Sequence, residues 1–273
     1  MGSKVAVKWV TALGAVAACA AALAALAALA SQPWGRQWAE LSLVVRQAEA
    51  IADAIEGRGP ALLTVPVRVE SAPVVLEVAL PGEPPLVVSE EYDRLVLRAP
   101  VHRFAIIRGW GARKPSRAPV YVGRAGRGEN LTALPSADVV VRVYQVGYEV
   151  VVDPMPALAY ARTDSGRVEV ACGGRIVTQV FEVDRTVHAL TLVLVRAPRE
   201  GLREGALLER TGWHAYVRSC YHACAHSGVA RVYLSGEEVA SFPVESGDLV
   251  AVSVVVTHLR CVPLRAPEQS HGG

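Results

Sequence analysis

The stretch Ser246–His258 reads SGDLVAVSVVVTH and shows most clearly how this chain folds. A Ser-Gly-Asp turn signal comes directly before a strand-length run, in which Val252, Val254 and Val256 fall on one face. Similar runs rich in β-branched residues recur from residue 61 onward, and turn signals separate them at intervals of roughly eight to twelve residues. This spacing predicts a mainly β fold with a β-sandwich region.

The turn signals also predict local connections. Thr163–Gly166 and Gly173–Gly174 each join two strands, which predicts a three-stranded meander. Residues 200–210 are the one place after residue 60 where a short helix is expected. The other expected strands are Leu63–Glu70, Val74–Leu80, Arg94–Arg98, Arg103–Ile107, Val120–Val122, Val139–Val152, Ala157–Arg162, Arg167–Cys172, Arg175–Val183, Val187–Arg196, Trp213–Cys220, Ala230–Leu234 and Glu238–Phe242.

The N-terminal segment is apolar. From Trp9 to Ala30 roughly 22 uncharged residues would form a helix about 33 Å long, enough to cross the hydrocarbon core of a bilayer. Lys4 and Lys8 precede this run and account for the net charge of +2, because the remaining basic residues equal the 26 acidic residues, which all follow it. Positive charge on the N-terminal side predicts a cytoplasmic N-terminus and an extracytoplasmic remainder.

Two interpretations of this run remain open. One is an uncleaved signal anchor, and the other is a signal peptide that is cut after Ala28-Leu29-Ala30. The run is longer than the usual apolar core of a signal peptide, about 7–15 residues, which favours the anchor. Both interpretations place the bulk of the chain outside the cytoplasm. Nucleic-acid binding is not expected, because that bulk carries no net positive charge.

A second helix is expected from Gln37 to Glu56, after Pro33 and Gly35 interrupt the first. Gly57 supplies a stop signal. This helix either covers a β-sheet or forms a stalk that packs on other copies of the chain, and too few heptads are present to choose. Its apolar residues recur at steps of three and four and make one face: Trp38, Leu41, Val45, Ala48, Ala52 and Ile55.

Four cysteines follow the apolar run, which itself contains Cys19. An even set in an oxidising compartment predicts disulfides among Cys172, Cys220, Cys224 and Cys261. On one strand Cys220 and Cys224 would lie about 13 Å apart, too far to pair. We therefore expect Cys261 to pair with one of these two, and Cys172 to take the other or stay free.

A metal site is the alternative use of these residues, and it competes with disulfides because metals bind free thiolates. Residues 220 and 226 would lie about 20 Å apart on a strand, so a tetrahedral site would need two neighbours plus ligands from elsewhere. The spacing matches no zinc finger or haem-attachment motif, and we expect no metal or other cofactor. The candidate ligands are Cys220, His222, Cys224, His226, His258 and Cys261.

A basic loop is expected between Arg108 and Asp138. It could contact anionic headgroups, an acidic polymer or a partner subunit, although a solvated loop is the simpler interpretation. Asn130 begins an Asn-Leu-Thr glycosylation sequon in this loop. The basic residues of its first part are Arg108, Arg113, Lys114, Arg117, Arg124 and Arg127.

The order of these parts resembles that of archaeal pilin-like and archaellum-associated surface proteins. Those proteins have one N-terminal apolar helix, an amphipathic continuation and then an extracellular β-sandwich, which correspond here to Trp9–Ala30, Gln37–Glu56 and the region from Leu63. The resemblance covers the architecture and no specific motif. No acidic residue precedes Glu40, unlike in processed pilins, so the resemblance implies an unprocessed accessory protein.

These observations divide the chain into a signal anchor (1–30), an amphipathic helix (31–60), one large β domain or two lobes (61–155 and 156–264), and a disordered tail (265–273). The catalytic motifs G-x-S-x-G and H-E-x-x-H are absent. We expect a non-enzymatic, single-pass membrane protein that contacts envelope or filament proteins or further copies of itself. The alternative is an extracytoplasmic β module that binds a metal or a small ligand.

Overall fold

The computed structural model describes residues 33–109, 120–124, 131–132, 139–163, 168–172, 175–177 and 185–263, together with Val16 and residues 18–23. Most of the expected membrane-spanning run Trp9–Ala30, the sequon at Asn130 and the tail 265–273 lie outside these residues. Among the described residues, no helix is long and apolar enough to cross a membrane.

The helix α2 (Pro33–Ile55) begins four residues before the start expected from the sequence. Pro33 fits at the first helical position, because a backbone N–H there has no partner within the helix. Gly57 ends the helix with φ +78°, and the N–H of Arg58 donates to the carbonyl of Asp53 at 2.8 Å. The stop signal at Gly57 is therefore confirmed.

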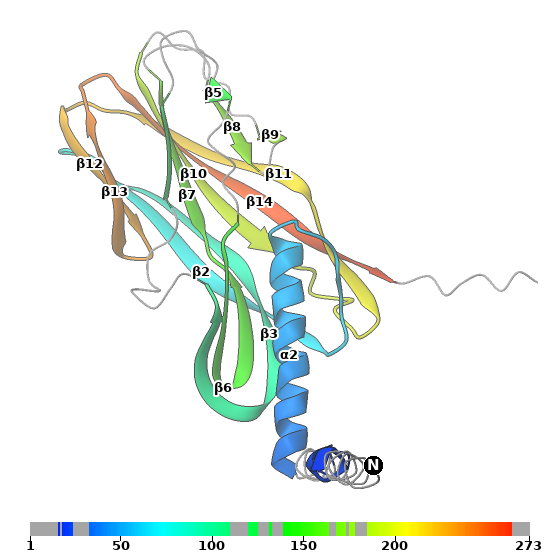
Figure 1. Cartoon of the computed structure of the whole chain (residues 1–273). Helices are drawn as coiled ribbons and strands as arrows, with labels where there is room; N and C mark the ends of the chain where they lie inside the picture. Colours follow the sequence, from blue (N-terminus) through cyan, green and yellow to red (C-terminus); the bar gives the residue numbers. More distant parts are fainter. Residues whose placement is uncertain are drawn as a thin grey trace, which may run out of the picture.

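One main sheet has five antiparallel strands in the order β13–β12–β2–β3–β6 (Figure 1). Pro73 and Pro100 do not end β2 and β3, so the two pairs of short strands expected there are two long strands. Pro73 lies where β2 has β3 on one side only, since β12 pairs β2 over Leu76–Ala79. The strands are β2 (Val67–Ala79), β3 (Leu86–Arg108), β6 (Val141–Pro154), β12 (Gly228–Leu234) and β13 (Glu237–Val244).

The other main sheet has six strands in the order β1–β11–β14–β10–β7–β4. At its centre β10 and β14 run parallel over ten residue pairs, from Val187–Leu249 to Arg196–His258. The short helix expected at 200–210 is wrong, because Ala206–Arg210 begin β11 and pair with β14. The strands are β1 (Ala61–Leu62), β4 (Val120–Arg124), β7 (Ala157–Thr163), β10 (Val187–Arg196), β11 (Ala206–Ala223) and β14 (Leu249–Pro263).

A small third sheet contains β5 (Leu131–Thr132), β8 (Val168–Cys172) and β9 (Arg175–Val177). The hairpin between β8 and β9 is confirmed, but β7 pairs with β10 and β4, so the predicted three-stranded meander is wrong. Each main sheet also takes strands from both sides of residue 155. The sheets therefore do not follow the expected division into the lobes 61–155 and 156–264, although the mainly β, sandwich-like architecture is confirmed.

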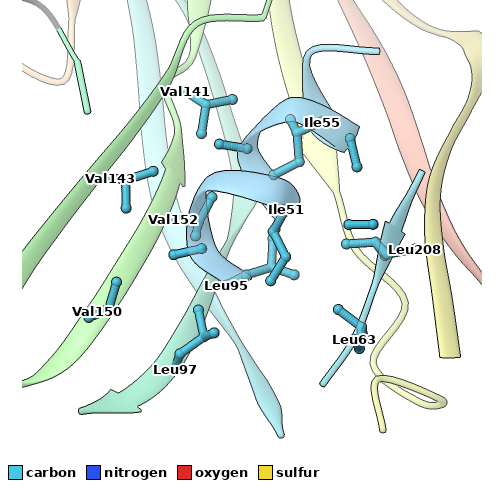
Figure 2. Packing of buried hydrophobic residues seen from close by; sticks show 14 of the residues in the cluster. Ile51, Ile55, Leu63, Leu95, Leu97, Val141, Val143, Val150, Val152 and Leu208 are labelled. Atoms are coloured by element: carbon cyan, nitrogen blue, oxygen red, sulfur yellow. The ribbon is translucent and has the colours of Figure 1, made fainter. Parts of the chain in front are cut away.

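Two clusters of buried side chains hold the fold together. The sandwich core lies between the main sheets and includes Leu76 of β2, Leu192 of β10 and Val254 of β14. The helix-capped core lies between α2 and strands of both sheets, and Figure 2 shows Ile51 and Ile55 of α2 at its centre. Residues packed around them include Leu63, Leu95, Leu97, Val141, Val143, Val150, Val152 and Leu208.

The apolar face of α2 is therefore used within the chain. Leu41, Ala48 and Ile55 are buried, and Val45 packs against the same core. The interpretation of α2 as a helix that covers a sheet is confirmed for its C-terminal two thirds, and this face is not available for packing on other copies. Trp38 departs from the pattern, because it is 49% exposed.

Candidate functional site

The predicted disulfide from Cys261 to Cys220 or Cys224 is absent. Cys224 and Cys261 are both free thiols, and the register of β14 explains why. The N–H of Cys224 bonds to Asp248, just before β14 begins, whereas Cys261 lies near the end of β14 opposite Leu208. This separation is about 40 Å along an extended strand.

The other predicted pairings are constrained by the same register. The backbone of Cys220 lies opposite Val252, about 30 Å along β14 from Cys261. The side chains of Cys172 and Cys220 lie outside the described residues, so a disulfide between these two stays a prediction. Burial, with smaller contributions from the charges of Glu83 and Asp248, raises the pKa of Cys224 to about 11. This thiol is therefore protonated and unreactive at neutral pH.

The candidate metal ligands do not assemble in the part of the chain that the structure describes, where no group of three or more His, Cys, Asp or Glu could hold an ion. His222 pairs with Val250 across β11 and β14, whereas His258 lies eight residues further along β14, about 26 Å away. The carbonyl of His258 accepts a hydrogen bond from Thr211 at 2.7 Å. The candidate ligands His222 and His258 thus lie in different parts of the sheet.

Glu83 lies beside His222, one of the candidate metal ligands. It lies in the turn between β2 and β3, and its side chain is only 9% exposed. Its carboxylate accepts a hydrogen bond from the N–H of Ala225 at 2.5 Å and contacts Nε2 of His222. The bond from Ala225, and then the charge of His222, hold the pKa of Glu83 below its usual value, although burial opposes them. Glu83 therefore joins the β2–β3 turn to the end of β11.

A second polar cluster lies deeper, between β7, β10 and the start of β14. His188 is fully buried, and its ring contacts the hydroxyl of Tyr160 through Nδ1 at 2.9 Å and Asp248 through Nε2 at 3.1 Å. Asp248 also accepts the N–H of Glu245 at 2.8 Å. In the neutral imidazole, Nε2 donates to the carboxylate and Nδ1 accepts from the phenol. The ring of Phe242 stacks on His188 with centroids 4.8 Å apart, which fixes the cluster.

Among the described residues, exposed apolar side chains gather on β3 and β6. Beyond a bend between Arg98 and Arg103, where the register shifts opposite Gly147, these two strands form a ribbon that β2 no longer accompanies. Phe104 is 73% exposed and Ile106 is 58% exposed. We call the outward side of this ribbon the ribbon face, and it consists of His102, Phe104, Ile106, Tyr144, Val146 and Tyr148.

Contacts between side chains on both the outward and the inward side of the ribbon hold it in place. The ring of His102 packs edge-on against Phe104 at 5.5 Å and against Tyr148 at 5.3 Å. On the inward side, Nε of Arg103 donates to the carboxamide oxygen of Gln145 at 2.6 Å, and Gln145 donates to the carbonyl of Val101 at 2.5 Å. These bonds hold the bend in place, so the aromatic rings are presented on a fixed backbone.

An open hollow of about 490 Å³ lies along this surface. Phe104, Ile106 and Val146 supply apolar contacts, and Arg108 and Arg142 add positive charge. Arg142 also donates to the buried Asp153 at 2.8 Å, and Arg108 pairs at 2.5 Å with Glu56, which directly follows α2. Arg108, expected in a solvated loop, is therefore part of the fold.

The contacts of Glu83 and His188 were hardly visible in the sequence. Glu83 follows a Pro-Gly pair and resembles any turn residue, and His188 sits alone within an apolar strand. Asp248 was visible only as part of a turn signal. The alternation of Phe104 and Ile106 with Arg103 and Ala105 did indicate a strand with two different faces, but not which of them would be covered.

Comparison with known protein families, with curated protein sequences and with solved structures finds no match for this chain.

Proposed function

We propose that this protein is a non-enzymatic, membrane-anchored structural or interaction protein of the cell envelope or of a surface filament. Trp9–Ala30 would be the anchor, the N-terminus would be cytoplasmic, and the β region would be extracytoplasmic. The resemblance in architecture to archaeal pilin-like and archaellum-associated surface proteins agrees with this assignment.

The observation that carries the proposal is the division of α2 into two parts. Residues 36–40 are exposed, whereas from Leu41 onward one face of the helix is buried in the helix-capped core. The exposed part begins only a few residues after Ala30, so α2 connects the apolar run directly to the β region. A helix with this division is suited to link a membrane anchor to a folded extracytoplasmic region. The exposed ribbon face would be the surface that contacts other proteins.

The test is the behaviour of the full chain in membranes of an expression host. We expect the protein to remain in the membrane through a carbonate wash, with its β region open to protease from the extracytoplasmic side. Replacing Leu23 and Leu26 by Arg should release it, because a central Arg costs about 2.5–3.5 kcal/mol in a spanning helix.

The matched control is Leu43→Arg, which changes an exposed leucine of α2 and should leave the protein in the membrane. A soluble wild-type chain whose N-terminus is Ser31 would instead show that the run is a cleaved signal peptide. A wild-type chain that is soluble with its N-terminus intact would reject anchoring altogether.

A further inference from the structure

The ribbon face has the apolar area of one half of a small dimer interface. Its large exposed side chains are Phe104 at 73%, Ile106 and Tyr148 at 58% each, and Val146 at 49%. An aromatic residue covers about 150–250 Å² and Ile or Val somewhat less, so these four expose roughly 400 Å² on one copy.

This area can be compared with what a stable dimer needs. Standard interfaces bury about 1,200–2,000 Å² over both partners, and the interfaces of homodimers are about 65% apolar. The smallest of them therefore need about 800 Å² of apolar surface. Two ribbon faces together supply roughly this amount, so a second copy of the chain is a partner of sufficient size.

The ribbon face also carries a protruding ring next to a hollow. Phe104 is the most exposed of its side chains, and it borders the open hollow of about 490 Å³ that Ile106, Tyr144 and Val146 also line. A contact about a two-fold axis joins the same surface of both copies. The Phe104 ring of each copy can then enter the hollow of the other. Aromatic side chains that fill a pocket in this way contribute most of the binding energy in many interfaces.

The charges around the hollow allow two such faces to approach each other. Arg108 and Arg142 line the hollow, so a two-fold contact brings the arginines of both copies close together. Each arginine is already paired within its own chain, Arg108 with Asp53 and Glu56, and Arg142 with Asp153. These pairs reduce the repulsion between the copies. The ribbon face itself consists of uncharged side chains and one histidine.

We propose that the ribbon face binds the ribbon face of a second copy of this chain about a two-fold axis. This inference rests on the proposed function, because it names the partner of the surface that an interaction protein would use. The side chains of the face are held in place before the copies meet, by the hydrogen bonds of Gln145 and the edge-on packing of His102. Little side-chain freedom is therefore lost on contact.

The test uses the full chain in membranes of an expression host, with p-benzoylphenylalanine in place of Phe104. Irradiation should join two copies and give a band at twice the mass of the chain on a denaturing gel. Peptides from this band should link position 104 to residues 106–108 or 142–146 of the other copy. The control carries the same photoreactive residue in place of Val229, which is 57% exposed on β12 and separated from β6 by β2 and β3. The control should give no such band.

Further variants test whether the contact depends on the ribbon face. With the photoreactive residue kept at position 104, Ile106→Glu should lower the yield of the double-mass band at least tenfold, because a carboxylate would leave water inside an apolar contact. Val87→Glu, at a 55% exposed position of the same strand, should leave the yield unchanged. Tyr148→Ser is a second, uncharged disruption and should lower the yield several-fold. Unchanged thermal midpoints in detergent will show that each variant is folded.

The outcomes separate the two proposals. Equal yields of the double-mass band from positions 104 and 229, or no such band from either, overturn this inference and leave the anchor untouched. Equal yields in Ile106→Glu and Val87→Glu overturn it as well, and so do bands that join position 104 to a host protein instead of a second copy. The carbonate wash tests the anchor by itself. A chain that leaves the membrane but still forms the double-mass band from position 104 rejects anchoring and supports this inference.

Discussion

The sandwich core has strands on both sides, whereas the helix-capped core has strands on one side and α2 on the other. β10 and β14 contribute to both: Leu192 and Val254 face the sandwich core, and Val195 and Leu259 face the helix-capped core. A strand buried on both faces needs a nearly continuous apolar sequence, and Val187–Val195 is buried throughout with His188 and Thr191 as its two polar residues.

The ribbon beyond the bend shows the opposite arrangement. There β3 has one face toward the core and one face exposed, so its residues alternate in burial. The contrast shows that exposed rings can lie on a strand whose other face is packed against the protein. The same strand that closes the helix-capped core at Leu95 and Leu97 carries Phe104 and Ile106 outward a few residues later.

Removing side chains from the centre of each core should have the largest effect. Ile51→Ala and Leu192→Ala remove fully buried side chains, and each should lower the free energy of unfolding by about 2–5 kcal/mol. Because β3, β10 and β14 belong to both cores, we expect one cooperative urea transition in each variant. Leu43→Ala, at a 58% exposed position of α2, is the control and should change stability by less than about 0.5 kcal/mol. Biphasic unfolding of either core variant would show that the cores are independent.

A smaller effect is expected at the polar edge of the sandwich core. Asp248→Ala leaves the Nε2–H of His188 and the N–H of Glu245 without their acceptor, which should cost about 1–3 kcal/mol. Asp248→Asn keeps one acceptor oxygen and should lose less. Urea unfolding measures both variants. Equal losses in the two would mean that the carboxylate acts by its charge alone.

In the helix-capped core, the exposed turns of α2 should contribute less to the free energy of unfolding than the buried turns. Trp38→Ala removes a ring stacked under Arg103 and should cost about 0.5–1 kcal/mol. Leu41→Ala, less than one turn later, should cost about 2–5 kcal/mol because Leu41 is buried. Thermal unfolding of the detergent-solubilised chain compares the pair. A loss at Trp38 as large as that at Leu41 would show that Trp38 is covered by further protein.

The smallest effect on stability is expected in the turn between β2 and β3, where Glu83 lies. The pKa of Glu83 in the folded chain lies below its usual value of 4.5, so its ionised form stabilises the fold at neutral pH. This contribution is lost as the pH falls from about 4.5 through the lower folded pKa. Glu83→Gln should therefore lower the thermal midpoint slightly at pH 7, and the gap to the wild type should close in acid. A gap that is constant with pH would exclude the charge of Glu83 as its cause.

The strands themselves were largely predictable from the sequence, because buried strands are rich in β-branched and other apolar residues. Val187–Arg196 has the bounds expected, and the start of β14 at Leu249 was also expected. Errors occurred where proline was interpreted as an end. Pro73 and Pro100 lie within long strands, at an edge and at a bend respectively, where a missing N–H costs little.

Strand neighbours and the candidate site were not predictable. Side-chain periodicity says which residues share a face, but not that β14 would lie parallel to β10 and antiparallel to β11. The cysteine pairing was wrong for this reason, since it depended on which strands lie side by side. The Glu83 contact and the Tyr160–His188–Asp248 cluster join residues far apart in sequence, and no spacing pattern marks such sets.

The place of β14 has a consequence for how the chain is made. The last described strand, Leu249–Pro263, hydrogen-bonds to β10 on one side and to β11 on the other, so it fills the middle of the six-stranded sheet. Until these residues leave the ribosome, β10 and β11 have no partner between them, and neither core can close. Pairing over such long sequence separations is intrinsically slow. The six-stranded sheet therefore cannot form before Leu249–Pro263 has been synthesised, however early its other strands are made.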